Sequence, residues 1–158
     1  MERIVLADPP IMGGWRLANH PNMGILYLSG YLKRELPGVE VVYLEQQLKL
    51  GEHLEKLRER RPLLYGLSFS SMLLDDAETT IARVREIYPD LKIVCGGPHP
   101  SAMPEQVARI PGVWACAVGE GEETFRDLVR GARGDGPPLR EIPGLAFMDD
   151  GAFVRTPP

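Results

Sequence analysis

The sequence contains few of the features that mark membrane, secreted or nucleic-acid-binding proteins. It has no apolar run of about 18 residues, so no transmembrane helix is expected. Its N-terminus lacks a basic segment followed by a long apolar one, which argues against a secretory signal peptide. The net charge is −4 and no cluster of Lys and Arg stands out, which argues against a nucleic-acid partner.

Cysteine is also scarce. The two cysteines, Cys95 and Cys116, are typical of reduced thiols in a cytoplasmic protein. Both lie inside apolar strand-like segments, so we expect them to be small core residues. Two cysteines cannot hold an iron–sulfur cluster by themselves. A chain of 158 residues can bury a core of its own and needs neither a disulfide nor a metal to stabilise it.

Strand and helix patterns alternate along most of the chain. Strands are expected at residues 3–7, 39–44, 63–69, 91–95 and 113–118, and helices at 22–36, 52–61, 75–88, 104–110 and 122–130. The third helix is expected to open at Asp75, with Glu78 completing a capping box. This alternation predicts a Rossmann-like α/β fold: a five-stranded parallel sheet in the flavodoxin-like order 2-1-3-4-5, with helices on both faces.

The alternation stops after Gly131. Residues 145–148 and 152–154 flank Asp150-Gly151, a pair typical of a hairpin turn. We therefore predict a ligand-binding α/β domain at residues 1–132. Residues 133–158 are expected to form a loop, a β-hairpin and a linker toward a domain that the chain lacks.

Unusual loops follow four of the five predicted strands. Ligands of such sheets bind at the carboxyl ends of the strands, and the predicted order makes these four loops neighbours. The second strand, at the edge, ends in Glu45-Gln46-Gln47 and looks plain. The candidate binding residues are Pro9, Pro10, Met12 and Gly13 after the first strand; Ser68, Ser70, Ser71 and Met72 after the third; Gly96, Gly97, Pro98 and His99 after the fourth; and Gly119, Glu120, Gly121 and Glu122 after the fifth.

The residue types in these loops suit a bulky neutral or polar molecule. Glycines let backbone approach a ligand closely, and the serines offer hydroxyl groups. No Gly-x-Gly-x-x-Gly follows the first strand and no P-loop is present, which argues against a dinucleotide. A response regulator is excluded, because Ser70 stands where its phosphate-accepting Asp would end the third strand.

Each loop also has a purely structural interpretation. Gly96-Gly97 can form a tight turn, Ser68 and Ser70 can bond local backbone, and His99 can be a rigid loop residue. Glu120 and Glu122 can simply favour the N-terminus of the next helix. His20 and His53 are expected at the surface. Trp15 and Met12 differ, because they lie in a long loop and can contact a ligand or a partner domain.

In this order and spacing, the loops resemble the N-terminal cobalamin-binding domain of cobalamin-dependent radical S-adenosylmethionine enzymes. The resemblance covers nearly the whole chain and rests on Asp8-Pro9-Pro10, residues 24–32, residues 66–70, residues 96–100 and residues 118–122. The tail, with residues 142–146 and 156–158, looks like the segment that precedes the radical domain. Enzymes of this kind include methyltransferases and the anaerobic Mg-protoporphyrin monomethyl ester cyclase.

The resemblance implies cobalamin as the cofactor. The larger cobalamin-binding group has an Asp-x-His-x-x-Gly motif whose His binds cobalt, but residues 8–13 lack the His. It therefore implies base-off cobalamin with no lower His ligand. The serines after the third strand and Gly96-Gly97 match positions that accommodate the nucleotide tail in that group. Met72 or Leu73 is a candidate to cover the lower face of cobalt.

The other half of such an enzyme is absent from the sequence. Radical generation needs a Cys-x-x-x-Cys-x-x-Cys triplet, which the chain does not have. We therefore expect a module that is not catalytic alone. Its partner would be a radical domain, in a longer chain or separate, that holds S-adenosylmethionine and the [4Fe–4S] cluster and acts on a small molecule. Two alternatives remain: a cofactor-free domain that docks or shields substrate, and a flavin-type binder.

Overall fold

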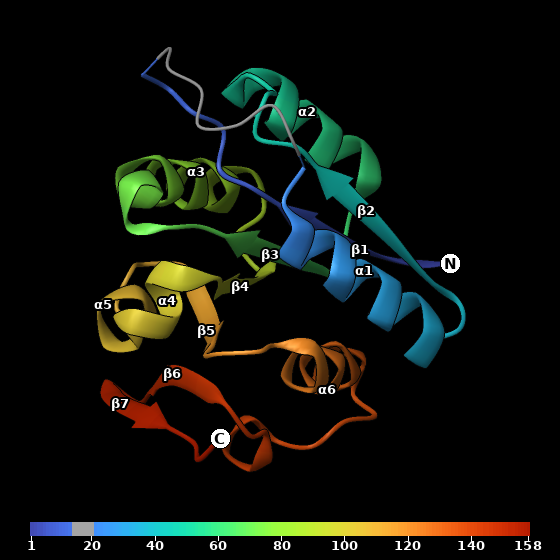
Figure 1. Ribbon diagram of the computed structural model, residues 1–158, viewed down its shortest axis with the longest axis vertical. Helices are drawn as coiled ribbons and strands as arrows, with labels where there is room; N and C mark the ends of the chain where they lie inside the picture. Colours follow the sequence, from blue (N-terminus) through green and yellow to red (C-terminus); the bar gives the residue numbers. More distant parts are fainter. Residues whose placement is uncertain (14–20) are drawn as a thin grey trace.

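A single mixed β-sheet with strand order β2-β1-β3-β4-β5-β6-β7 forms the centre of the molecule (Figure 1). The computed structural model describes residues 1–13 and 21–158. The parallel strands are β1 (Glu2–Ala7), β2 (Val39–Leu44), β3 (Leu64–Ser68), β4 (Lys92–Gly96) and β5 (Val113–Ala117). The predicted α/β class and the order 2-1-3-4-5 are confirmed.

Helices cover both faces of the sheet (Figure 1). α1 (Met23–Glu35) and α6 (Glu122–Arg133) pack on one face, while α2 (Leu50–Arg60), α3 (Leu74–Ile87) and α5 (Pro104–Ala108) pack on the other. Successive strand residues point to opposite faces, so Ile4 and Leu6 join the α1 and α6 side, whereas Val5 and Ala7 join the other. Strands buried on both faces explain the short, continuous apolar runs of the sequence.

The predicted C-terminal hairpin extends the same sheet. β6 (Leu145–Asp149) pairs antiparallel with β5, and β7 (Ala152–Arg155) pairs antiparallel with β6. Asp150 and Gly151 have φ angles of 47° and 82°, as the tight turn between the strands requires. The sheet therefore has seven strands rather than five plus a separate hairpin. The division at residue 132 between domain and linker stays a prediction.

Local elements differ from the sequence pattern between residues 70 and 102. α3 begins at Leu74, directly after the 3₁₀ turn η1 (Ser71–Leu73), and Asp75 is not its cap. The capping-box prediction was wrong because Leu74 already has helical angles and continues the turn into the helix. A short helix, α4 (Pro98–Ala102), replaces the loop expected after β4. Proline at the first helical position favours this start.

The burial of both cysteines agrees with the sequence prediction, whereas the burial of His53 does not. Cys95 and Cys116 are buried in neighbouring strands, as expected for core residues. His53 is fully buried, although the sequence places it at the surface. It shares a helix face with Leu57, four residues on, so it turns inward, and its Nε2 lies 2.8 Å from the Tyr65 hydroxyl. Trp15 and His20 lie outside the described residues. No helix of the described part is long and apolar enough to cross a membrane.

Candidate functional site at the carboxyl edge of the sheet

Small residues lie on one face of three neighbouring strands. Gly66, in the middle of β3, and Gly96 and Ala117, the last residues of β4 and β5, all lie on the face that α1 and α6 cover. Earlier in β3 and β4 the same face carries larger side chains, Leu64 and Val94. The small residues Gly96 and Ala117 leave open space between the sheet and the two helices, whereas Leu6 and Phe125 fill the space over Gly66. This space is the inner slot.

The inner slot is a cavity of about 250 Å³. Its wall from α1 consists of Gly24, Ile25 and Leu28, and Phe125 contributes from α6. The remaining lining residues are Leu6, Gly66, Leu67, Ser68, Val94, Gly96, Gly97, Ala117, Gly119, Glu120, Gly121 and Glu122. Pockets that enclose a whole ligand usually measure ~300–1,000 Å³, so this slot suits one arm of a larger molecule.

Glycine is favoured at two positions beside the slot, by its backbone angle at Gly97 and by close side-chain packing at Gly66. Gly97 has a φ of 95°, and a Cβ there would lie 2.7 Å from the Ser68 Oγ. A Cβ on Gly66 would lie 2.7 Å from the Leu6 Cδ2. Gly96 differs, because a Cβ there would meet nothing nearer than 3.9 Å. A longer side chain at Gly96 would therefore enter the slot without straining the backbone.

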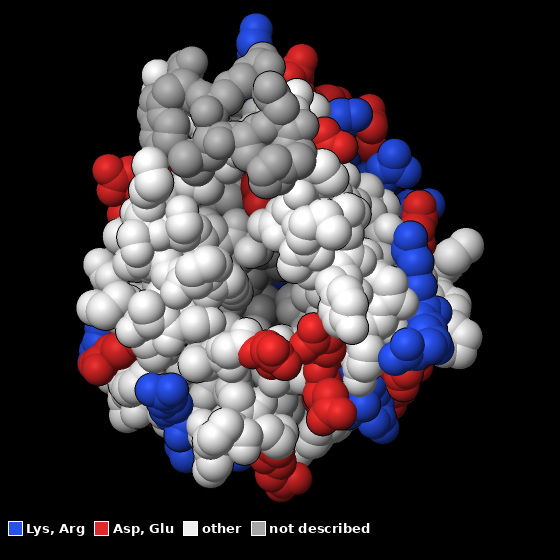
Figure 2. Space-filling model, in the orientation of Figure 1, with Lys and Arg blue, Asp and Glu red and all other residues white. Residues whose placement is uncertain are grey.

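A second cavity, the outer hollow, measures about 560 Å³ and shares Gly24, Ser68 and Gly97 with the inner slot. Its other lining residues are Asp8, Pro21, Asn22, Met23, Tyr43, Glu45, Gln46, Gln47, Phe69, Ser70, Leu73 and Pro98. Figure 2 shows a hollow near the middle of the face in view, with acidic side chains along its lower margin. The shared residues make the two cavities neighbours, so one large ligand can reach both.

A polar network of three residues forms part of the wall of the outer hollow. The buried Asp8 carboxylate accepts hydrogen bonds from the Asn22 Nδ2 at 2.8 Å and from the Tyr43 hydroxyl at 2.5 Å. Burial raises the pKa of Asp8, while the two donors act in the opposite direction. Burial, together with the hydrogen bond to Asp8, also raises the pKa of Tyr43. The network therefore joins β1, β2 and the start of α1 through hydrogen bonds.

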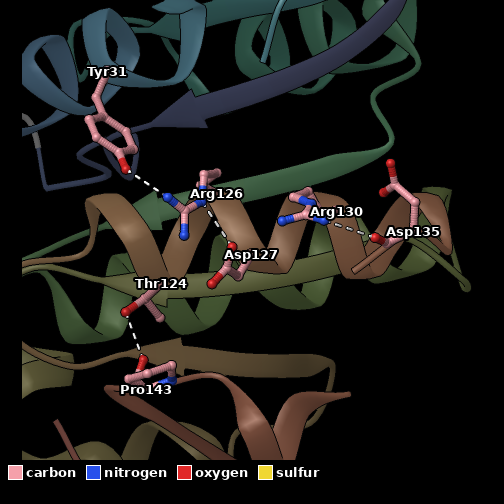
Figure 3. A network of polar contacts seen from close by, with 7 residues as sticks. All are labelled: Tyr31, Thr124, Arg126, Asp127, Arg130, Asp135 and Pro143. Atoms are coloured by element: carbon pink, nitrogen blue, oxygen red, sulfur yellow. Dashed lines mark hydrogen bonds and ion pairs between the residues drawn. The ribbon is translucent and has the colours of Figure 1, made fainter. Parts of the chain in front are cut away.

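A second network joins the two helices that form the slot walls (Figure 3). The Arg126 Nη1 of α6 donates to the Tyr31 hydroxyl of α1 at 3.2 Å, and its Nε pairs with Asp127 at 2.9 Å. Thr124 Oγ1 donates to the Pro143 carbonyl at 2.8 Å. These bonds hold α6 against α1 on one side and against the segment before β6 on the other.

Nine of the predicted site residues line the two cavities. They are Ser68, Ser70, Gly96, Gly97, Pro98, Gly119, Glu120, Gly121 and Glu122. Glu120 and Glu122 are the acidic residues at the slot, where the first turn of α6 favours negative charge. The structure therefore brings the loops after β3, β4 and β5 together, as the strand order predicts.

The other predicted residues lie outside both linings. Pro9 and Pro10 are buried, whereas Met12 and Gly13 are exposed, and the Met12 amide donates to Asp76 at 3.2 Å. Met72 is 65% exposed on η1. A ligand contact of these residues stays a prediction.

His99 and Ser71 contact each other rather than either cavity. The Ser71 Oγ lies 2.8 Å from the His99 Nδ1, and the His99 Nε2 lies 3.1 Å from the Gln106 Oε1. The His99 ring also stacks on Phe69 with centroids 5.9 Å apart. Both ring nitrogens are thus engaged within the protein, which favours the structural interpretation of this histidine.

Sequence reasoning missed residues on two sides of the site. Glu45, Gln46 and Gln47 line the outer hollow although their loop looked plain. Their position follows from the pairing of Ala7 with Leu44, which ends β2 at the same edge as β1. The slot residues Leu28 and Phe125 have the helical spacing of core positions, so nothing in the sequence distinguishes them from core.

The family of the chain follows from a direct comparison. The model of the B12 binding domain matches residues 11–129, which is most of the chain. The chain belongs to the B12-binding domain family. This confirms the family resemblance drawn from the loops and identifies cobalamin as the cofactor of the family.

Curated relatives and a solved structure agree with this membership. An uncharacterized methyltransferase, PH0819, of Pyrococcus horikoshii is 29% identical over 87% of this chain and 30% of its own length. The anaerobic magnesium-protoporphyrin IX monomethyl ester cyclase of Rubrivivax gelatinosus is 30% identical over 92% of the chain and 27% of its own length. The chain thus spans less than a third of these relatives.

The fold is shared with a solved structure of the cobalamin-dependent S-adenosylmethionine radical enzyme OxsB, with aqua-cobalamin and S-adenosylmethionine bound. The TM-score is 0.83 at 24% identity, over 99% of this chain and 22% of that one. The match extends through the C-terminal hairpin, so β6 and β7 belong to the shared fold.

Proposed function

We propose that this domain binds cobalamin base-off, with the nucleotide tail in the inner slot, as the cofactor module of a radical S-adenosylmethionine methyltransferase or cyclase. The observation that carries the proposal is the inner slot itself. Gly96 and Ala117 open it between sheet and helices, and it adjoins a larger hollow at the sheet edge. A cofactor with a bulky macrocycle and one long arm matches this pair of cavities.

The residues present fit the two parts of such a cofactor. Gly96 and Gly97 leave space where the arm would enter, and a Cβ at Gly97 would collide with Ser68. Around the outer hollow, Gln46, Gln47 and Ser70 offer amide and hydroxyl groups. These groups can both donate and accept hydrogen bonds, as the amide side chains at the edge of a corrin ring require.

The two histidines of the described residues support the base-off state. His53 lies in the core against Tyr65, and His99 has both ring nitrogens bonded. The Asp8 carboxylate contacts Asn22 and Tyr43 rather than a histidine. In this proposal Leu73, which lines the outer hollow, or the exposed Met72 lies under cobalt.

The partner role rests on length and on the missing cysteine triplet. The curated relatives are more than three times as long as the matched segment, so the rest of each can hold further machinery. We propose that a radical domain, fused or separate, supplies S-adenosylmethionine and the [4Fe–4S] cluster and binds a small-molecule substrate. Bound cobalamin would supply methyl transfer or radical chemistry, while this chain would bind and orient the cofactor.

The binding proposal is tested with hydroxocobalamin. The protein is incubated with the cofactor, desalted and examined by visible absorption, beside the variants Gly96→Leu and Gly51→Leu. Gly96→Leu fills the slot, whereas Gly51 is exposed on α2 and a Cβ there meets nothing within 4 Å. We expect the wild type and Gly51→Leu to retain the corrin spectrum and Gly96→Leu to lose it. Colourless wild-type protein would instead favour the cofactor-free docking domain.

Electron paramagnetic resonance of the reduced, Co(II)-containing protein tests the axial ligand. A base-off signal without nitrogen coupling is expected if neither the tail nor a histidine binds cobalt. Nitrogen coupling would contradict the base-off state while leaving cobalamin binding intact.

A further inference from the structure

The interior of the inner slot is apolar. Leu6, Ile25, Val94, Ala117 and Phe125 line it, and each is at most 5% exposed. Within the described lining, polar side chains come only from Ser68, Glu120 and Glu122. Glu120 is exposed and Glu122 is half-buried, so water still solvates the acidic mouth.

Several backbone groups of the slot lining are already paired within the protein. The Gly96 carbonyl accepts from the Phe69 amide at 3.1 Å, and the Gly121 carbonyl accepts from the Phe125 amide at 2.7 Å. The Gly119 amide donates to the Ser101 Oγ at 2.9 Å. A polar ring atom at the slot interior would therefore lose water and find few replacement partners.

We propose that the inner slot selects the base at the end of the cofactor tail, accepting a benzimidazole and discriminating against a purine. This inference rests on the proposed cobalamin function and deepens it. Dimethylbenzimidazole presents a hydrocarbon edge with two methyl groups, whose burial against Val94 and Phe125 is favourable. Adenine presents ring nitrogens and an amino group at that edge, and leaving them unpaired weakens binding.

Leu28 is the position where this selectivity can be changed with least disturbance. It lies on α1, lines the slot and is half-buried, so a polar side chain there can still reach solvent in the free protein. Glutamine forms helix about as well as leucine, and its amide can pair with the donor and acceptor edge of adenine. Tyr27, the preceding residue, is 74% exposed and does not line either cavity.

Three cobamides test the selection on the wild-type protein by visible-absorption titration: cobalamin, the same molecule with adenine in place of dimethylbenzimidazole, and cobinamide, which has no base. We expect cobalamin to bind at least tenfold more tightly than either of the others. Equal affinity for cobalamin and the adenine form, with weaker cobinamide, would overturn the selection but keep the tail in the slot. Equal affinity for all three would overturn both. Binding of none would instead contradict the proposed function itself.

Two variants assign the selection to the slot lining. In Leu28→Gln we expect the ratio of the two dissociation constants, adenine form over cobalamin, to fall at least threefold. In Tyr27→Gln we expect the wild-type ratio. Thermal unfolding without ligand confirms that both variants are folded. An unchanged ratio in folded Leu28→Gln, or an equal fall in both variants, would overturn the assignment.

Discussion

Asn22 connects the first helix to the buried carboxylate of Asp8. Its Oδ1 accepts from the Ile25 amide at 3.2 Å as the cap of α1, and its Nδ2 donates to Asp8 at 2.8 Å. The Asn22 side chain thus joins the residue that follows β1 to the first turn of α1. Because α1 is a wall of the inner slot, this pair also positions the candidate site.

Replacing Asn22 tests this link. Asn22→Ala removes the cap and one donor to a buried carboxylate, so we expect a loss of about 1–3 kcal/mol in the free energy of unfolding. Asn22→Ser keeps a capping oxygen but cannot span to Asp8 in the same way, so an intermediate loss is expected. Urea unfolding measures both. Equal stability of Asn22→Ala and the wild type would show that the pair does not hold α1.

His53 makes stability depend on pH. Burial lowers the pKa of His53 to about 4 from its usual 6.5, so the unfolded chain binds a proton over a range where the folded chain does not. Stability is therefore complete above pH 6.5 and falls as the pH decreases toward 4, by up to ~3 kcal/mol. Urea unfolding at pH 7.5, 5.5 and 4.5 measures this decrease.

His53→Gln is the matched variant, because its amide does not titrate and can still pair with the Tyr65 hydroxyl. We expect the variant to be less sensitive to pH between 6.5 and 4 than the wild type. The same pH dependence in both proteins would assign the decrease to other groups.

The fold could be predicted from the sequence because strand and helix periods alternate clearly and each helix has an apolar face. The cavities could be predicted only in part. Gly96 and Gly97 are visible as a pair, but the slot also needs Ala117 on the same face of the neighbouring strand. That coincidence depends on strand register, which a single sequence does not specify.

The position of His53 shows a different limit. A polar residue in a charged helix favours the surface, and its partner Tyr65 lies on β3, outside the helix pattern. Likewise, Glu45, Gln46 and Gln47 gain significance only when β2 lies beside β1. Both depend on contacts between segments that are distant in the sequence.

The contact between Arg126 and Tyr31 is expected to stabilise the two slot walls against each other. Tyr31→Phe removes the hydroxyl that accepts from Arg126 but keeps the ring that the Arg34 guanidinium covers at 5.4 Å. We expect a loss of about 1 kcal/mol in the free energy of unfolding. A double-mutant cycle with Arg126→Gln measures the coupling, and additive effects would show that the two side chains act independently.

Gly97 combines a backbone requirement with a steric one. Its φ of 95° disfavours any other residue, and a Cβ would approach the Ser68 Oγ to 2.7 Å and the Phe69 nitrogen to 3.1 Å. Gly97→Ala should therefore lower the free energy of unfolding by about 1–3 kcal/mol and also weaken cobalamin binding. Gly51→Ala lies in the exposed part of α2 and should raise stability by up to ~1 kcal/mol, since alanine favours helix. If Gly97→Ala were as stable as Gly51→Ala, the close approach of β4 to Ser68 would not constrain the site.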